Sequence, residues 1–178
     1  MILMIGVGTV AMAGTSIAPV APWSPNADRI LAQWSKMFHK HFTREEALKE
    51  TCRFPAEEEV GVKAYPGSLL FDWKRGGGTA SDGDDVPEVD LATKAPLDEV
   101  IAWYKSHYPN LRPKYIFETA GPGIVYDSTD HTLVAKASGA NYVEDTQGNF
   151  VGCGGLIAVP KNAGYQTAIR IFYRPRGH

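Results

Sequence analysis

The chain has 178 residues, of which 44% are aliphatic or aromatic and 21% are charged, and its formal net charge at pH 7 is −2. This length suits one domain with a sizeable core, and the composition is that of a globular chain. The net charge gives no field that would attract nucleic acid or an anionic membrane. The 18 glycines and 12 prolines favour a protein of strands and turns over a helical bundle.

The first 23 residues contain no charged side chain. The apolar run from Ile2 to Ala13 has the length of the hydrophobic region of a signal peptide, and its end, A-M-A-G, resembles a cleavage site. The run is short for a membrane span, which needs about 20 apolar residues. No Lys or Arg precedes it, so a buried N-terminal strand or helix is the alternative. We expect residues 1–23 to be an export signal and linker, processed near Ala13 or within the next ten or so residues. The mature chain is then periplasmic or secreted, with no stable membrane span.

The two cysteines are Cys52 and Cys153. A pair of cysteines in an exported protein favours a disulfide, and two unpaired buried thiols are the alternative. Neither residue lies in a C-x-x-C motif, so the sequence supports neither a zinc ribbon nor a thioredoxin-type redox site.

Residues 24–53 are predicted to form an N-terminal helical arm. Ser24 and Pro25 suit an N-cap and a first helical position. A helical pattern then covers 24–42, and its stripe at spacings of three and four is expected to pack on the rest of the protein. The stripe consists of Ile30, Leu31, Trp34, Met37, Phe38 and His41. Thr43 with Glu46 three residues later is a capping box, so a second helix is expected over 44–51.

Residues 54–178 are expected to form a single α+β domain. Residues 60–75 are predicted to form a turn followed by a strand of alternating side chains, and residues 86–94 are predicted to form a second strand. A helix follows, with Pro96 at its first position and acidic residues in its first turn, where the helix dipole favours them. Its apolar stripe should bury Tyr104 against a sheet, with Trp103 at the edge of the stripe. The stripe consists of Leu97, Val100, Ile101, Tyr104 and Tyr108.

The remaining residues are predicted to form an antiparallel meander, in which turn residues separate five candidate strands. These strands cover 114–119, 123–128, 131–137, 154–160 and 165–174. In the last one, Ile169 and Ile171 lie on one face and Arg170 on the other, which is typical of a sheet with one face in water. The predicted fold is therefore an antiparallel sheet of five or six strands. One amphipathic helix packs on one face of that sheet, and the N-terminal helical arm is additional.

One stretch resembles a family of small secreted bacterial α+β domains. The residues that carry the resemblance are Tyr-Pro-Gly-Ser at 65–68, the strand that ends in Thr93, and the acidic helix around Glu99 to Lys105. The family pattern there is Y-P-G-small, a strand ending in Thr, then [DE]-V-[IV]-x-[WF]-Y-K. The resemblance spans roughly residues 65–108. It implies a fold type and an exported location, and it implies no reaction.

Two clusters have the residue types of metal ligands. His39 and His41 are two residues apart, so on a helix they would point to nearly opposite sides, which is a poor geometry for one metal. The segment Ser-Asp-Gly-Asp-Asp at 81–85 is acidic, but its glycine comes too early for an EF-hand loop. Packing or solvent exposure is the expected role of the histidines, and a solvated loop is expected at 81–85.

Two further clusters could carry chemistry or binding. Asp127, Ser128, Asp130 and His131 have the residue types of a hydrolase, but a hairpin turn uses the same types for its own hydrogen bonds. Arginines mix with aromatic residues from Arg170 to the C-terminus, as in single-strand binding proteins. A polar sheet face explains this second pattern more simply in an acidic, exported chain.

Two classes of function follow from the sequence. We expect a non-enzymatic exported module that binds a protein, an envelope component or a small-molecule ligand, and that does not bind nucleic acid. No catalytic, cofactor-binding or metal-binding residue is assigned, and no cofactor is expected. The alternative is a small hydrolase or metal-dependent enzyme that uses His131 with Asp127 or Asp130. An enzyme would need these side chains to meet in a pocket, whereas a binding module needs an exposed apolar patch.

Overall fold

The computed structural model describes residues 16–79, 85–108, 112–113, 121–127, 132–138 and 145–173. Its α-helices are α1 (Ala27–Phe38), α2 (Arg44–Thr51), α3 (Glu57–Val60) and α4 (Leu97–His107). The 3-10 helices are η1 (Cys153–Gly155) and η2 (Lys161–Ala163). The strands are β1 (Leu69–Thr79), β2 (Asp85–Thr93), β3 (Arg112–Pro113), β4 (Gly121–Asp127), β5 (Thr132–Ser138), β6 (Phe150–Gly152), β7 (Ile157–Val159) and β8 (Thr167–Phe172).

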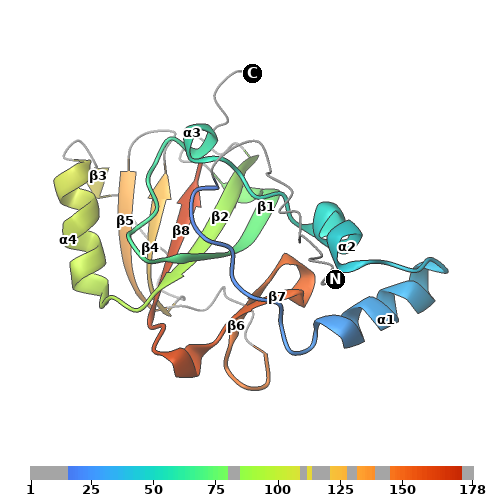
Figure 1. Cartoon of the computed structure of the whole chain (residues 1–178). Helices are drawn as coiled ribbons and strands as arrows, with labels where there is room; N and C mark the ends of the chain where they lie inside the picture. The colour runs from blue at the N-terminus through green and yellow to red at the C-terminus, as the bar shows by residue number, and fades with distance from the viewer. Residues whose placement is uncertain are drawn as a thin grey trace, which may run out of the picture.

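Six strands form one sheet in the order β1-β2-β8-β4-β5-β3, and β6 and β7 form a separate hairpin (Figure 1). The predicted α+β class is confirmed. The prediction of a wholly antiparallel sheet is wrong at two pairs, because β8 is parallel to β4 and β3 is parallel to β5. The last strand does not continue a meander at the sheet edge but inserts between β2 and β4.

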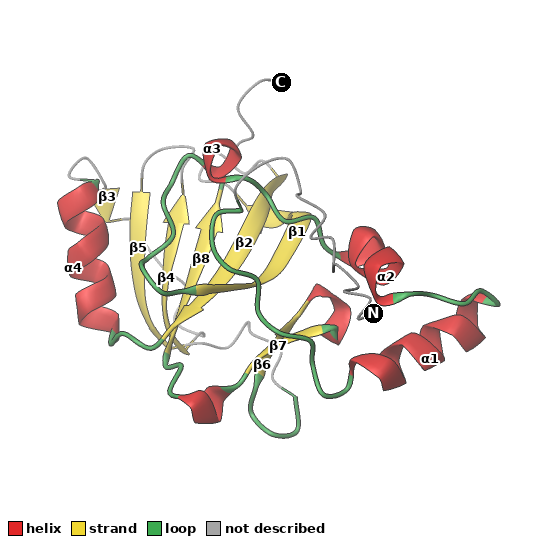
Figure 2. Ribbon diagram, viewed as in Figure 1, coloured by secondary structure: helices red, strands yellow, loops and turns green. Residues whose placement is uncertain are grey.

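Helix α4 explains part of this mixed topology. The pairings make β2 and β3 run in the same direction, and a connection between such strands must cross over the sheet, usually through a helix. Helix α4 is that crossover, and it packs against β4 and β5. Figure 2 shows α4 beside β5 and β3, at the edge of the sheet that lies farthest from α1 and α2.

The predicted apolar stripe of α4 is confirmed. Val100 and Tyr104 are fully buried in the main core, and the Tyr104 hydroxyl donates to the carbonyl of Lys63 at 3.1 Å. Trp103 is half-buried at the edge of the stripe, with its ring centroid 5.5 Å from that of Tyr65. Pro96 is the N-cap of α4 and not its first helical residue, so the helix begins one residue later than predicted.

An extended segment, residues 16–24, runs along the edge strand β1 and on to the β6–β7 hairpin. The backbone N–H of Leu70 donates to the carbonyl of Pro19, and Ala21 donates back to Leu70, both at 2.8 Å. Farther along, Ser24 donates to the carbonyl of Leu156 at 2.8 Å. Residues 16–23, which lie within the predicted signal and linker, are therefore paired with the folded domain.

Candidate binding site on the helical arm

The two helices of the arm are each fixed by local capping. In α2 the Thr43 backbone donates to the Glu46 carboxylate at 2.9 Å, and the Glu46 backbone donates to the Thr43 hydroxyl at 3.2 Å. The predicted capping box and the predicted bounds of α2 are thus confirmed. Helix α1 is shorter than predicted. It starts after Asn26, and it ends at Phe38 because His39 has a left-handed conformation, with φ of 51°.

A small second core fastens the arm to the β6–β7 region. Ala27, Leu31 and Ala47 are buried together with Leu156, which lies between η1 and β7. A Cβ on Gly154 would lie 3.0 Å from the Trp34 ring, so the indole of α1 packs directly on η1. The predicted disulfide between Cys52, the C-cap of α2, and Cys153 in η1 is present in the structure.

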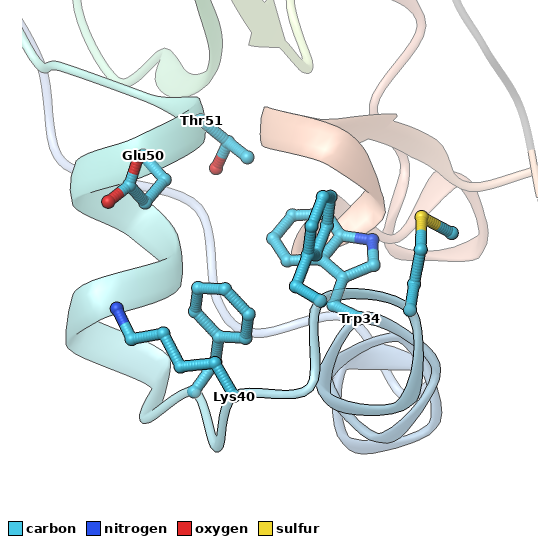
Figure 3. Close-up of a pocket in the computed structure, with 7 residues that line it drawn as sticks. Trp34, Lys40, Glu50 and Thr51 are labelled. Atoms are coloured by element: carbon cyan, nitrogen blue, oxygen red, sulfur yellow. The ribbon is translucent and has the colours of Figure 1, made fainter.

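An apolar groove of about 580 Å³ lies between α1 and α2 (Figure 3). Phe42 forms one wall, and its ring meets Trp34 and Phe38 edge to face, with centroids 6.2 and 6.0 Å away. The charged groups at the rim are Lys40 and Glu50. The groove is lined by Trp34, Met37, Phe38, Lys40, Phe42, Glu50 and Thr51. Its volume and apolar character are those of sites that bind apolar groups.

Met37 and Phe38 are left largely in solvent beside this groove, 66% and 59% exposed. Among the described residues they are the most exposed large apolar side chains. They end α1 next to the loop that joins it to α2, and Figure 1 shows this loop projecting away from the sheet. The prediction that the whole apolar stripe of α1 is buried is therefore wrong at the C-terminal end of the helix. Met37 and Phe38 extend the apolar surface of the groove towards the tip of the arm.

The exposed tip was not identified as a site from the sequence. Met37 and Phe38 fit the helical spacing of three and four, so the pattern placed them with residues such as Leu31 that do become buried. The left-handed turn at His39 ends the helix before the stripe reaches another element. The sequence signal that could have identified the tip is the composition of residues 36–42, which mix apolar side chains with lysine and histidine and contain no acidic one.

The two histidines lie in this same segment but do not share a helix face. His39 caps α1, and His41 lies in the following loop; both are exposed. They are therefore not on opposite faces of one helix, as the sequence predicted. In the described part of the chain, the group of residues with metal-ligand geometry is Cys52, Asp72 and Cys153. Its two sulfur atoms are bonded to each other, so neither is a thiolate ligand.

A buried charged cluster lies on the face of β1, β2 and β8 that carries Arg170. Arg170 donates to both carboxylate oxygens of Asp90 at 2.7 and 2.9 Å, and Lys74 donates to Glu88 at 2.7 Å. The Arg170 side chain is 11% exposed and both of these carboxylates are nearly fully buried. The prediction that this face is in water is wrong here. The opposite charges pair with each other, so the cluster has a structural explanation.

Asp72 lies at the edge of that cluster and has an unusual environment. It accepts the backbone N–H of Cys153 at 2.7 Å, and its cross-strand neighbour is Asp90. Burial raises the pKa of Asp72 to about 6, and the Asp90 carboxylate contributes in the same direction. The bond from Cys153 and the Lys74 ammonium group oppose this shift in pKa.

The remaining candidates from the sequence fall mostly outside the described residues. Strand β4 ends at Asp127 and β5 begins at Thr132, and the two strands are antiparallel. Residues 128–131, which include Ser128, Asp130 and His131, are outside the described ranges, as are residues 81–84 and the arginines beyond Tyr173. The predicted pairing of His131 with Asp127 or Asp130 therefore lies outside the described residues.

Comparisons with protein-family models, curated proteins and solved structures find no match to this chain. Among the helices of the described ranges, none has the length and apolar character that crossing a bilayer requires. The arm groove with its exposed tip is the candidate site that the described residues support best.

Proposed function

We propose that this chain is an exported, non-enzymatic binding module that associates with the cell envelope through its helical arm. One observation carries the proposal: the apolar groove between α1 and α2 opens directly onto Met37 and Phe38, which are exposed at the projecting end of the arm. Exposed apolar side chains cost solubility, and a contiguous patch of them marks a contact surface.

The way the arm is held supports this role. The Cys52–Cys153 disulfide and the packing of Trp34 on Gly154 fix the groove before any partner arrives. A preformed site loses less conformational entropy on binding than a flexible one. The disulfide also suits an oxidising compartment outside the cytoplasm, in agreement with the apolar N-terminal segment.

Cell fractionation tests this function. The chain is produced with its N-terminal segment in a bacterial host, and the envelope and aqueous fractions are separated and quantified. We expect the wild type in the envelope fraction, and the Met37→Ser/Phe38→Ser variant in the aqueous fraction. Val20→Ser is the matched control, because Val20 is also an exposed apolar residue but lies on the segment beside β1. Equal distribution of wild type and tip variant would contradict the proposal.

A further inference from the structure

The arm differs in charge from the rest of the chain. The sixteen residues from Arg29 to Arg44 contain four basic and no acidic side chains, plus two histidines, within a chain of net charge −2. Arg44 is paired with Asp28 at 2.7 Å. Lys36 and Lys40 have no ion-pair partner in the described part of the chain. The net charge of the whole sequence therefore conceals a local cationic surface.

This cationic surface borders the apolar groove. A second hollow, of about 560 Å³, shares Phe42 with the groove. Its titratable lining residues are Asp28, Lys36, His41 and Arg44, and because Asp28 pairs with Arg44, Lys36 is the lining cation that stays outside an ion pair in the described residues. On the groove side, the Lys40 ammonium nitrogen lies 4.7 Å from the centre of the Phe42 ring. An apolar hollow and a basic hollow thus meet at one aromatic side chain. A ligand that is apolar at one end and anionic at the other would contact both.

We propose that the arm docks on the surface of a bilayer that contains anionic phospholipid, an inference that rests on the function proposed above. Met37 and Phe38 enter the boundary between headgroups and acyl chains, and Lys36 and Lys40 lie among the phosphates. Amphipathic elements at membrane surfaces combine aromatic and aliphatic side chains with flanking Lys or Arg in this way. The long lysine stems allow the ammonium groups to stay at headgroup level.

The position of the apolar residues favours a bilayer over an acidic peptide. A peptide in the groove would cover Trp34 and Phe42, but Met37 and Phe38 continue the apolar surface out to the projecting end of α1. A flat, extended bilayer contacts such an end without needing a matching shape. The arm reaches it without a membrane span, because insertion of two side chains and attraction of two charges give reversible binding.

Vesicle co-sedimentation of the purified chain tests this inference. One set of vesicles contains equal parts of phosphatidylglycerol and phosphatidylcholine, and the other contains phosphatidylcholine alone. We expect binding to the first set that weakens in high salt, and binding at least about tenfold weaker to the second. The Lys36→Gln/Lys40→Gln variant should lose about 30-fold in affinity, since each basic residue near an anionic surface contributes roughly fivefold.

The matched control is Lys63→Gln/Lys105→Gln, which removes the same charge from two exposed lysines at the α4 end of the molecule. All variants keep the same N-terminal segment, so any difference between them belongs to the substituted side chains. The inference is overturned if the wild type binds both vesicle sets equally. It is also overturned if the control variant loses as much affinity as Lys36→Gln/Lys40→Gln. If isolated envelopes bind the chain but the vesicles do not, anionic phospholipid is not the ligand, and the proposed association with the envelope still holds. If neither binds, both proposals fail.

Discussion

Cys52 and Cys153 are 101 residues apart in the sequence, but their Cα atoms lie 5.1 Å apart and their sulfur atoms form a disulfide. This bond joins the end of α2 to η1, next to Asp72 and the glycine pair at 154–155. The arm would otherwise be held mainly by a small apolar core of four buried residues. The disulfide therefore adds a covalent link to the apolar packing that holds the arm against the β6–β7 region.

Removing this disulfide should destabilise the protein. A cross-link that closes a loop of about 100 residues contributes about 4.7 kcal/mol in the chain-entropy model, and measured losses are about 2–5 kcal/mol. We expect the Cys52→Ala/Cys153→Ala variant to lose stability in this range in denaturant unfolding. The amides of α1 and α2 should also exchange hydrogen faster than those of β2 and β8. Unchanged exchange in the arm would mean that the disulfide does not hold it.

Tyr104 should contribute most of the stability that α4 provides. Its ring is fully buried and its hydroxyl bonds to the Lys63 carbonyl, so Tyr104→Ala should cost about 3–5 kcal/mol. Tyr104→Phe should cost only about 1 kcal/mol, which is the contribution of the hydrogen bond. Asp98→Ala should cost less than about 1 kcal/mol, because Asp98 is an exposed first-turn charge. Denaturant unfolding of the three variants measures these losses of stability. If Tyr104→Ala left the stability unchanged, the packing of α4 on the sheet would not depend on Tyr104.

Helices and strands with strong local patterns were predictable from the sequence. Thr43 and Glu46 specify the start of α2 by themselves, and the spacing of Val100 and Tyr104 defines the buried face of α4. These features depend on residues within one or two turns of each other. The same holds for β2, which was predicted over 86–94 and lies at Asp85–Thr93.

The sheet order and the exposed tip could not be predicted, because both depend on distant parts of the chain. The insertion of β8 between β2 and β4 is decided by pairing across about 80 residues, and the alternation in β8 is the same at a sheet edge or centre. Met37 has the spacing of a core residue, and only the turn at His39 leaves it without a partner element. The alternation in β8 predicts a solvent-exposed Arg170 side chain, but this side chain is paired with Asp90 on the neighbouring strand β2.

Gly152 should tolerate no side chain. A Cβ at this position would lie 2.1 Å from the Phe71 carbonyl oxygen and 2.6 Å from the Asp72 Cβ, because the end of β6 passes directly over β1. We expect Gly152→Ala to cost about 3 kcal/mol or more in denaturant unfolding, since backbone atoms must shift. Gly67→Ala is the control: it has open space and a φ of 73°, so it should cost only about 1–2 kcal/mol. Equal losses in the two variants would contradict the close contact.

Asp72 should make the stability depend on pH in a defined window. Its pKa is about 6 in the folded protein against an ordinary value of 3.8, so between about pH 4 and pH 6 the unfolded chain loses this proton while the folded chain keeps it. The contribution of Asp72 to stability is therefore present below pH 4 and is lost as the pH rises to 6. The shift corresponds to about 3 kcal/mol.

Comparison with Asp72→Asn isolates this effect from other carboxylates. The asparagine does not ionise, and its side-chain oxygen can still accept the Cys153 N–H. The stability of the variant relative to wild type should increase by about 3 kcal/mol between about pH 4 and pH 7. Denaturant unfolding at several pH values measures this difference. A constant difference would show that Asp72 titrates normally.

The most direct test of the central claim is the affinity of the purified chain for isolated bacterial envelopes, measured for the wild type, Met37→Ser/Phe38→Ser and Val20→Ser. Covering the exposed parts of two large apolar side chains contributes about 1–2 kcal/mol each. The dissociation constant of the tip variant should therefore rise about 30-fold or more, while Val20→Ser binds like the wild type. The tip variant should lose only about 1 kcal/mol of unfolding stability, because the contact between Phe38 and Phe42 is the packing that it removes. A tip variant that binds as tightly as the wild type would contradict the assignment of the helical arm as the binding surface.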